Sequence, residues 1–171
     1  MIGPVNWRRS GLVAQVKVPR GEKVLAVTRA GDGTVLAGTR DAFYVVSGDD
    51  TRRVPWEQVE AADWDRDTDT FRLSEVGTWG EERPVHTAVL PDPGRLLELV
   101  RERVTASVVL QRHVGVAPRR GLRVIARRAP SGSGGVQWVY EYDEGVDPDD
   151  PAVRDLARAT LEAMRLEVGL P

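Results

Sequence analysis

The residues with the clearest capacity for chemistry are arginines that gather around position 123. They are Arg119, Arg120, Arg123, Arg127 and Arg128. A guanidinium group can hold a phosphate or a carboxylate through two parallel hydrogen bonds. In an extended strand alternate side chains share a face, so Arg123 and Arg127 would point one way and Arg128 the other. The strand expected next carries Trp138 and Tyr140, and aromatic rings near arginines are typical of single-stranded RNA binding.

An acidic segment directly after that strand offers a different explanation of the same arginines. Its acidic residues are Glu141, Asp143, Glu144, Asp147, Asp149 and Asp150. Adjacent blocks of opposite charge can neutralise each other within a fold. The sequence therefore leaves two interpretations open. The arginines are either a surface for an anionic partner such as RNA or members of an internal network of ion pairs.

No pattern in the sequence has the ligand spacing of a metal site. Cysteine is absent, and His86 and His113 lie far apart without an HxH or HExxH motif. The text DRDTD at 65–69 opens like a calcium-binding loop. However, Thr70 stands where that loop needs glycine, and Val76 stands where it needs glutamate. We therefore predict no metal and no cofactor.

Catalytic motifs are missing from the sequence as well. No serine stands in a GxSxG elbow, and Ser131 and Ser133 belong to an expected loop, which positions a nucleophile poorly. The text SGSGG has neither the GxGxxG spacing nor the P-loop spacing that cradles phosphates. The sequence thus predicts a protein that is not an enzyme and has no small-molecule ligand. A hydrolase that uses His86 or His113 is kept as a lesser alternative.

Overall composition is that of an ordinary globular protein. The 171 residues are 41% hydrophobic and 29% charged, and the formal net charge of −2 does not indicate a general nucleic-acid binder. No apolar run approaches the roughly 20 residues of a membrane-spanning helix, and the first residues lack a signal-peptide pattern. We expect a cytoplasmic protein without integral membrane association. Peripheral lipid binding is a weaker alternative, because no basic amphipathic helix supports it.

Alternating apolar residues and regularly spaced turn signals predict a mainly β (α+β) fold. Seven short strands are expected first, over 23–30, 34–39, 42–46, 52–54, 59–64, 69–76 and 83–90. Apolar residues at helical spacing then predict a helix over 92–105. After it, a strand over 107–114 is preferred to a longer helix, because β-branched residues lower helix propensity there.

The rest of the chain is expected to form a β-hairpin and a helix. The hairpin strands are predicted over 121–129 and 136–142, on either side of the glycine- and serine-rich loop. The final helix should begin with Asp150 as its cap and Pro151 in its first turn. Its apolar stripe indicates packing. We expect two parts, 1–106 and 107–171, with the second packed on the first.

Two stretches of text resemble bacterial pleckstrin-homology-like (PH-like) domains. They are TVLAGTRDAFYVV at 34–46 and RVPWEQVEAADWDRDTDTFRL at 53–73, and the latter includes the Val-Pro-aromatic-x-x-Val pattern. The resemblance covers about 21–106. It implies a bent antiparallel sheet or barrel of seven strands, capped by the helix at 92–105. Such domains bind phosphoinositides, peptides or proteins, but the expected first hairpin loop at 30–33 lacks the basic cluster of the lipid-binding kind.

These observations favour a non-enzymatic binding or scaffolding protein of the cytoplasm. A protein partner is the leading expectation, since open strand edges and aromatic anchors are usual means of binding proteins. RNA binding through the arginines is the alternative, and a homo-oligomer stays open.

Overall fold

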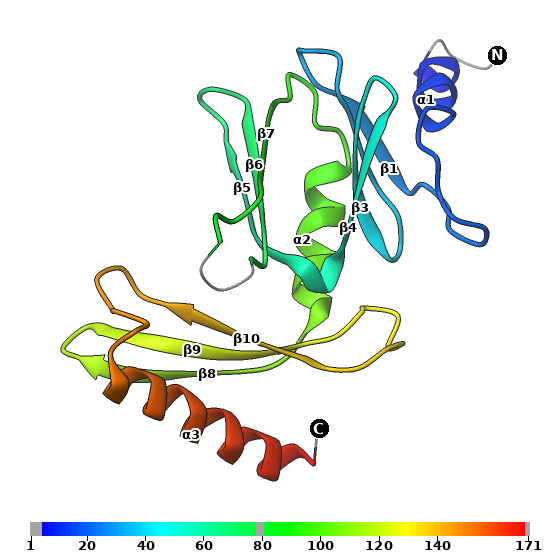
Figure 1. The fold of residues 1–171 in the computed structure, drawn as a ribbon. Coiled ribbons are helices and arrows are strands. Elements are labelled where there is room, and N and C mark those ends of the chain that lie inside the picture. The colour runs from blue at the N-terminus through cyan, green and yellow to red at the C-terminus, as the bar shows by residue number, and fades with distance from the viewer. Residues whose placement is uncertain (1–4, 78–80, 170–171) are drawn as a thin grey trace. The chain divides into compact units, whose positions relative to one another are not determined.

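The computed structural model describes residues 5–77 and 81–169, with side chains from residue 9 onward. Within these ranges the chain forms three antiparallel sheets and three α-helices, which confirms the prediction of a mainly β fold (Figure 1). The sheets are not closed into a barrel. The chain divides into two compact units. Unit 1 comprises residues 1–107 and 129–131, and unit 2 comprises 108–128 and 132–171.

Unit 1 contains a four-stranded sheet and a three-stranded sheet. The first sheet is formed in order by β1 (Ala26–Arg29), β2 (Val35–Gly38), β3 (Ala42–Ser47) and β4 (Asp50–Pro55). A short 3₁₀ turn, η1 (Trp56–Gln58), leads into the second sheet. That sheet is formed in order by β5 (Val59–Asp65), β6 (Thr70–Glu75) and β7 (Val85–Val89). Every one of the predicted strands therefore has a counterpart, and β4 is longer than expected.

Helix α2 (Leu96–Ser107) follows β7 and contacts β5, β1 and β2. The helix was expected over 92–105, but it begins at Leu96. The Asp92 carboxylate accepts a hydrogen bond from the Gly94 amide, 3.1 Å, and Gly94 has a left-handed φ of 52°. This turn holds the chain out of the helix until Leu96. The N-terminal helix α1 (Val5–Val13) was not predicted, because its sequence has little apolar periodicity.

The space between the two sheets holds the main apolar core. Trp56, Phe43 and Phe71 are buried there, and Phe43 lies about equally close to both other rings, with centroids 6.1 Å and 5.8 Å apart. Helix α2 contributes Leu96, Leu99 and Val100 to the same cluster. The helix packs directly on β2 because Gly38 has no side chain. A Cβ at that position would lie 2.6 Å from the Leu99 Cδ2 atom.

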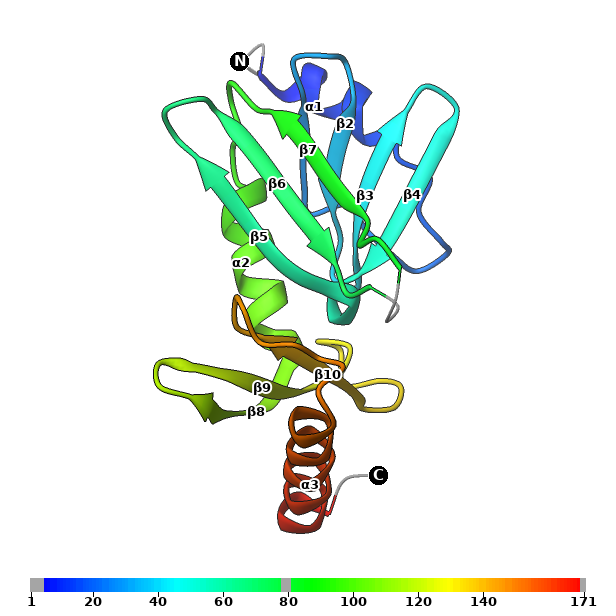
Figure 2. The ribbon, with the colours of Figure 1, turned by 60° about the vertical axis from the view of Figure 1, so that its left-hand side comes forward.

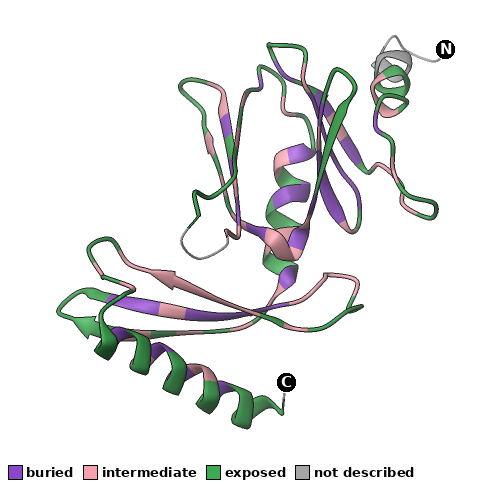
Figure 3. Cartoon of the chain, viewed as in Figure 1, coloured by how far each residue is buried: buried purple, intermediate pink, exposed green. Residues whose placement is uncertain are grey.

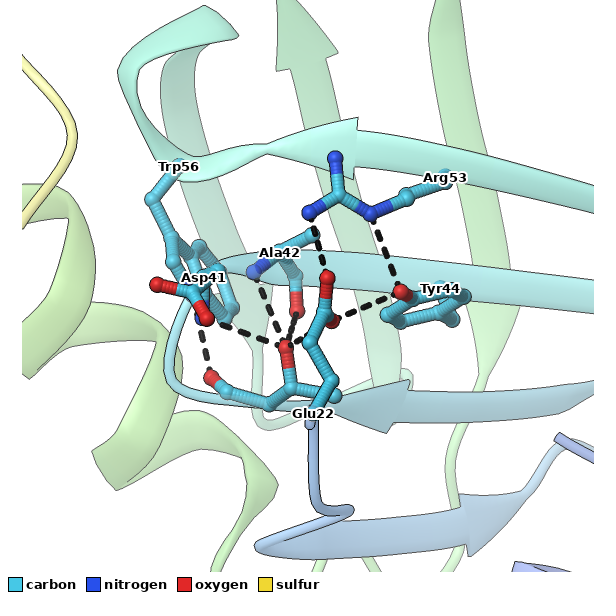
Figure 4. Close-up of polar contacts among 7 residues, drawn as sticks. Glu22, Asp41, Ala42, Tyr44, Arg53 and Trp56 are labelled. Atoms are coloured by element: carbon cyan, nitrogen blue, oxygen red, sulfur yellow. Dashed lines mark hydrogen bonds and ion pairs between the residues drawn. The ribbon is translucent and has the colours of Figure 1, made fainter. Parts of the chain in front are cut away.

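The outer face of the four-stranded sheet is covered by the segment after α1. Its Val16 joins Val35 and Tyr44 in a second apolar cluster. A buried polar network fastens the same segment (Figure 4). The Glu22 carboxylate accepts hydrogen bonds from the Tyr44 hydroxyl at 2.7 Å, the Arg53 guanidinium at 2.6 Å and the Thr39 hydroxyl at 2.8 Å. Burial, with the adjacent Glu22 carboxylate, raises the pKa of Tyr44 to about 12, so this hydroxyl acts as a donor at neutral pH.

Unit 2 is a three-stranded sheet with one helix on it. Its strands are β8 (Val108–Ala117), β9 (Arg120–Arg127) and β10 (Gln137–Tyr142), with β9 in the centre. The strand expected over 107–114 is thus confirmed, and it turns the predicted hairpin into a three-stranded sheet. Helix α3 (Pro151–Val168) has Asp150 as its cap, with the carboxylate accepting from the Ala152 amide, 2.8 Å. In Figure 3 the buried residues of α3 line its sheet-facing side.

Two glycines that face each other across β8 and β9 give a matched test of unit 2 packing. Gly115 and Gly121 are register partners. A Cβ at Gly121 would lie 2.1 Å from the Val114 carbonyl oxygen, whereas a Cβ at Gly115 meets nothing within 4 Å. We predict that Gly121→Ala lowers the free energy of unfolding by about 1–3 kcal/mol, measured by urea denaturation. Gly115→Ala is the control, and an equal loss in both variants would contradict this packing.

Candidate functional site

The structure separates the arginines of β9 from the aromatic residues expected beside them. Leu122 and Val124 face α3, so Arg123 and Arg127, which alternate with them, lie on the other face of the sheet. In β10, by contrast, the aromatic residues lie on the α3 side. Trp138 pairs with Ala126 and Tyr140 pairs with Val124, and both pack in the α3 cluster. The combined platform of Arg123, Arg127, Trp138 and Tyr140 is therefore not formed.

The other arginine positions are divided among several surroundings. Arg123 forms an ion pair with Glu141, its register partner on β10, at 3.0 Å. Arg127 is 3% exposed, and Arg128 is half-buried. Arg119 occupies the β8–β9 turn with a φ of 63°. The Arg120 guanidinium lies over Gly145, because a Cβ there would be 2.6 Å from Arg120 Nη1. The acidic segment thus supplies a partner to Arg123.

Each histidine lies next to one carboxylate. His113 Nε2 is 3.1 Å from Asp143 Oδ2, an atom that also accepts from the Gly121 amide at 2.7 Å. His86 Nε2 is 2.7 Å from Glu75 Oε1. A histidine with a carboxylate is part of a hydrolase site, but no hydroxyl is hydrogen-bonded to either ring among the described residues. In the same part of the chain, no group of three or more potential ligands could hold a metal ion.

His86 leads to a feature that sequence reasoning missed, a groove between the two sheets of unit 1. Figure 2 shows β7 running across β2 and β3 from the other layer. The groove has a volume of about 240 Å³. Its lining comes from four strands and the residue before β2: Thr34, Leu36, Val45, Ser47, Phe71, Val85, His86, Thr87 and Ala88. None of these side chains carries a formal charge when histidine is neutral.

An ion cluster joins the two sheets beside this groove. Glu75 of β6 points between the sheets and is 6% exposed. Arg52 of β4 binds it through two hydrogen bonds, Nε to Oε1 at 3.0 Å and Nη2 to Oε2 at 2.6 Å. Burial disfavours the ionised form of Glu75, but the hydrogen bonds from Arg52 and His86 outweigh it and lower the pKa of the carboxyl. Glu75 is therefore a carboxylate at neutral pH and connects β4, β6 and β7.

The free edge of β7 forms one wall of the groove. Glu75 donates its amide to the Pro84 carbonyl, and Leu90 donates to the Asp69 carbonyl. Antiparallel partners alternate between hydrogen-bonded and non-bonded pairs. Even-numbered residues of β7 therefore direct their backbone groups to β6, whereas Val85 and Thr87 direct theirs away from it. The Val89 carbonyl, also on this edge, accepts from the Gly31 amide at 2.9 Å.

Comparison with family models, curated proteins and solved structures found no match to this chain. The proposals below therefore rest on the geometry of the chain itself. Among the described residues, no helix has the length and apolar character needed to cross a membrane.

We predict that Glu75→Gln lowers the free energy of unfolding by about 1–3 kcal/mol at pH 7, because it weakens charged hydrogen bonds to Arg52 and His86. A carboxyl whose pKa is lowered on folding stabilises the protein above its unfolded pKa, and this contribution disappears as the pH falls through the folded value. The difference between wild type and variant should therefore shrink as the pH falls below the ordinary value of 4.5.

Urea denaturation of both proteins between neutral and acidic pH measures this difference. Glu144→Gln is the control, since Glu144 is exposed and the charge change is the same. A Glu75→Gln effect that does not change with pH would show that the ionised carboxylate is not the source of the stability.

Proposed function

We propose that this chain is a non-enzymatic, cytoplasmic binding protein whose unit 1 is a PH-like domain that binds an extended segment of a partner protein along β7. One observation carries the proposal. The backbone groups of Val85 and Thr87 point to an open edge, directly beside an uncharged groove. An added strand would use these groups for hydrogen bonds and the groove for its side chains, as in other β-strand additions.

The order of elements in unit 1 supports a PH-like domain. Four strands form one antiparallel sheet, three strands form the next, and a helix follows. Helix α2 contacts the edge strands β5 and β1, which is the capping position that the resemblance implies. Fold alone does not assign a function, so the choice of a protein partner depends on the edge and the groove.

Differences among the strand edges of unit 1 favour β7. Natural proteins discourage strand addition with charged side chains on edge strands. The β4 edge carries Asp50, Arg52 and Arg53, and the edges of β1 and β5 contact α1 and α2. The β7 edge carries no residue with a permanent charge, and its solvent-facing Val85 and Val89 are 41% and 48% exposed. This edge is therefore the one best suited to receive another strand.

The dimensions of the site favour a peptide segment over other occupants. A groove of about 240 Å³ is smaller than the roughly 300–1,000 Å³ of small-molecule sites, but it suits one or two aliphatic side chains. Since Gly31 already binds the Val89 carbonyl, an added strand has only Val85 and Thr87 fully available. A flexible segment can turn away at Gly31, whereas a second folded sheet needs a longer edge.

The structure of unit 2 removes the main support for the RNA-binding alternative. Trp138 and Tyr140 lie on the opposite face of the sheet from Arg123 and Arg127, and Arg123 is neutralised by Glu141. Fluorescence polarisation with labelled single-stranded RNA should therefore show no binding that weakens steeply with salt. Tight, salt-sensitive binding that disappears in Arg119→Glu/Arg120→Glu would restore the RNA alternative.

A proline substitution on β7 tests the proposed function. The Thr87 amide points away from β6, so Thr87→Pro removes a donor for an added strand without removing a pairing bond within the sheet. Thr51→Pro is the matched control, because Thr51 lies on the β4 edge and, by the same alternation from the Trp56-to-Asp41 bond, its amide also points outward.

The measurement is a titration of ¹⁵N-labelled protein with a synthetic peptide of one lysine followed by alternating valine and threonine. We expect shifts of the amide signals of Val85, Thr87, Leu36 and Val45 in wild type and in Thr51→Pro. Thr87→Pro should weaken the binding at least about tenfold, which corresponds to the loss of one or two backbone hydrogen bonds. Equal binding by both proline variants, or no shift in wild type, would overturn the proposed function.

A further inference from the structure

The groove beside β7 has acidic residues at one end. Thr34 and Ser47, which line the groove, each lie next to an aspartate. The Asp32 carboxylate accepts the Thr34 amide at 2.9 Å, and Asp50 is the register partner of Ser47. Hydrogen bonding from Thr34 lowers the pKa of Asp32, so this side chain is ionised at neutral pH. Neither aspartate forms an ion pair with another residue in the described ranges.

The middle and the far end of the groove offer no unbalanced negative charge. Apolar side chains of Leu36, Val45 and Phe71 form the middle. At the far end His86 faces Glu75, whose carboxylate already binds Arg52 through both oxygens. A positively charged group on a bound segment would therefore find unpaired carboxylates only at the Asp32 and Asp50 end. A charged side chain in the middle would lose water without gaining a partner.

The direction of β7 relates this asymmetry to the direction of a bound segment. Strand β7 runs from Val85, near the Glu75 cluster, to Val89, where the β1–β2 turn binds it through Gly31. A strand antiparallel to β7 has its amino-terminal end at that turn, which bears Asp32. All strand pairs within unit 1 are antiparallel, and antiparallel pairs are slightly more stable per residue than parallel ones.

We infer that the segment recognised along β7 runs antiparallel to it, carries a basic group at its amino-terminal end near Asp32 and Asp50, and fills the groove with uncharged aliphatic side chains at alternate positions. The basic group is a lysine or arginine side chain or a free α-amino group. This inference rests on the proposed function, and it specifies the chemistry of the partner.

Three synthetic peptides test the charge and the direction. The first has one lysine followed by alternating valine and threonine, and its amino terminus is acetylated. The second has the lysine at the carboxyl end of the same alternating sequence, and the third has glutamate in place of the lysine. Wild type should bind the first peptide about fivefold to tenfold more tightly than either of the others, as expected for gain or reversal of exposed ion pairs.

A charge reversal in the protein provides the complementary arm. Asp50→Lys should remove the preference for the lysine peptide over the glutamate peptide or invert it. Asp63→Lys, which makes the same change on an exposed position of β5, should leave the preference unchanged. Dissociation constants come from the amide shifts of ¹⁵N-labelled protein, which also report that each variant is folded.

The possible outcomes separate this inference from the function on which it rests. If none of the three peptides shifts the Val85 and Thr87 signals in wild type, the proposed function fails. If the peptides bind with equal affinity, or if Asp50→Lys leaves the preference intact, the β7 site stands and the inferred charge pattern is wrong. If the peptide with the carboxyl-terminal lysine binds most tightly, the inferred direction is wrong.

Discussion

The carboxylate of Glu75 holds together the side of unit 1 that the helix does not fill. On one side, α2 contacts β5, β1 and β2 and contributes its leucines to the core. On the other side, Glu75 binds Arg52 of the first sheet and His86 of the second. A buried carboxylate with its partners in place is stable, but it cannot be moved without breaking charged hydrogen bonds. The spacing of the sheets at the groove is therefore fixed by directional contacts.

This fixed spacing explains how an open edge and a groove persist together. If apolar side chains alone joined the sheets here, they could close over Leu36 and Phe71 and remove the groove. The ion cluster instead keeps β7 in position with its outward backbone groups unpaired. The Gly31 amide then bonds to the Val89 carbonyl at the end of the same edge. Rigid walls favour binding, because less conformational entropy is lost when a partner is ordered on them.

Much of the fold follows from local patterns, whereas the site depends on register. Alternation in 59–64 and 69–76 predicts β5 and β6, and Asp150 with Pro151 predicts the start of α3. The faces of Trp138 and Arg127 could not be related in this way. The loop between β9 and β10 is long, and only short hairpin turns fix the register of their strands. Alternation does place His86 on the inner face of β7, but its proximity to Glu75 and Arg52 requires the tertiary structure.

Hydrogen exchange of individual backbone amides in the free protein tests the central claim most directly, since it reports which amides of β7 are paired. The account predicts slow exchange at His86 and Ala88, whose amides are directed to β6, and fast exchange at Val85 and Thr87, whose amides are directed to the open edge. Protection of Val85 and Thr87 equal to that of His86 and Ala88 would contradict the account, because the β7 edge would then already be covered.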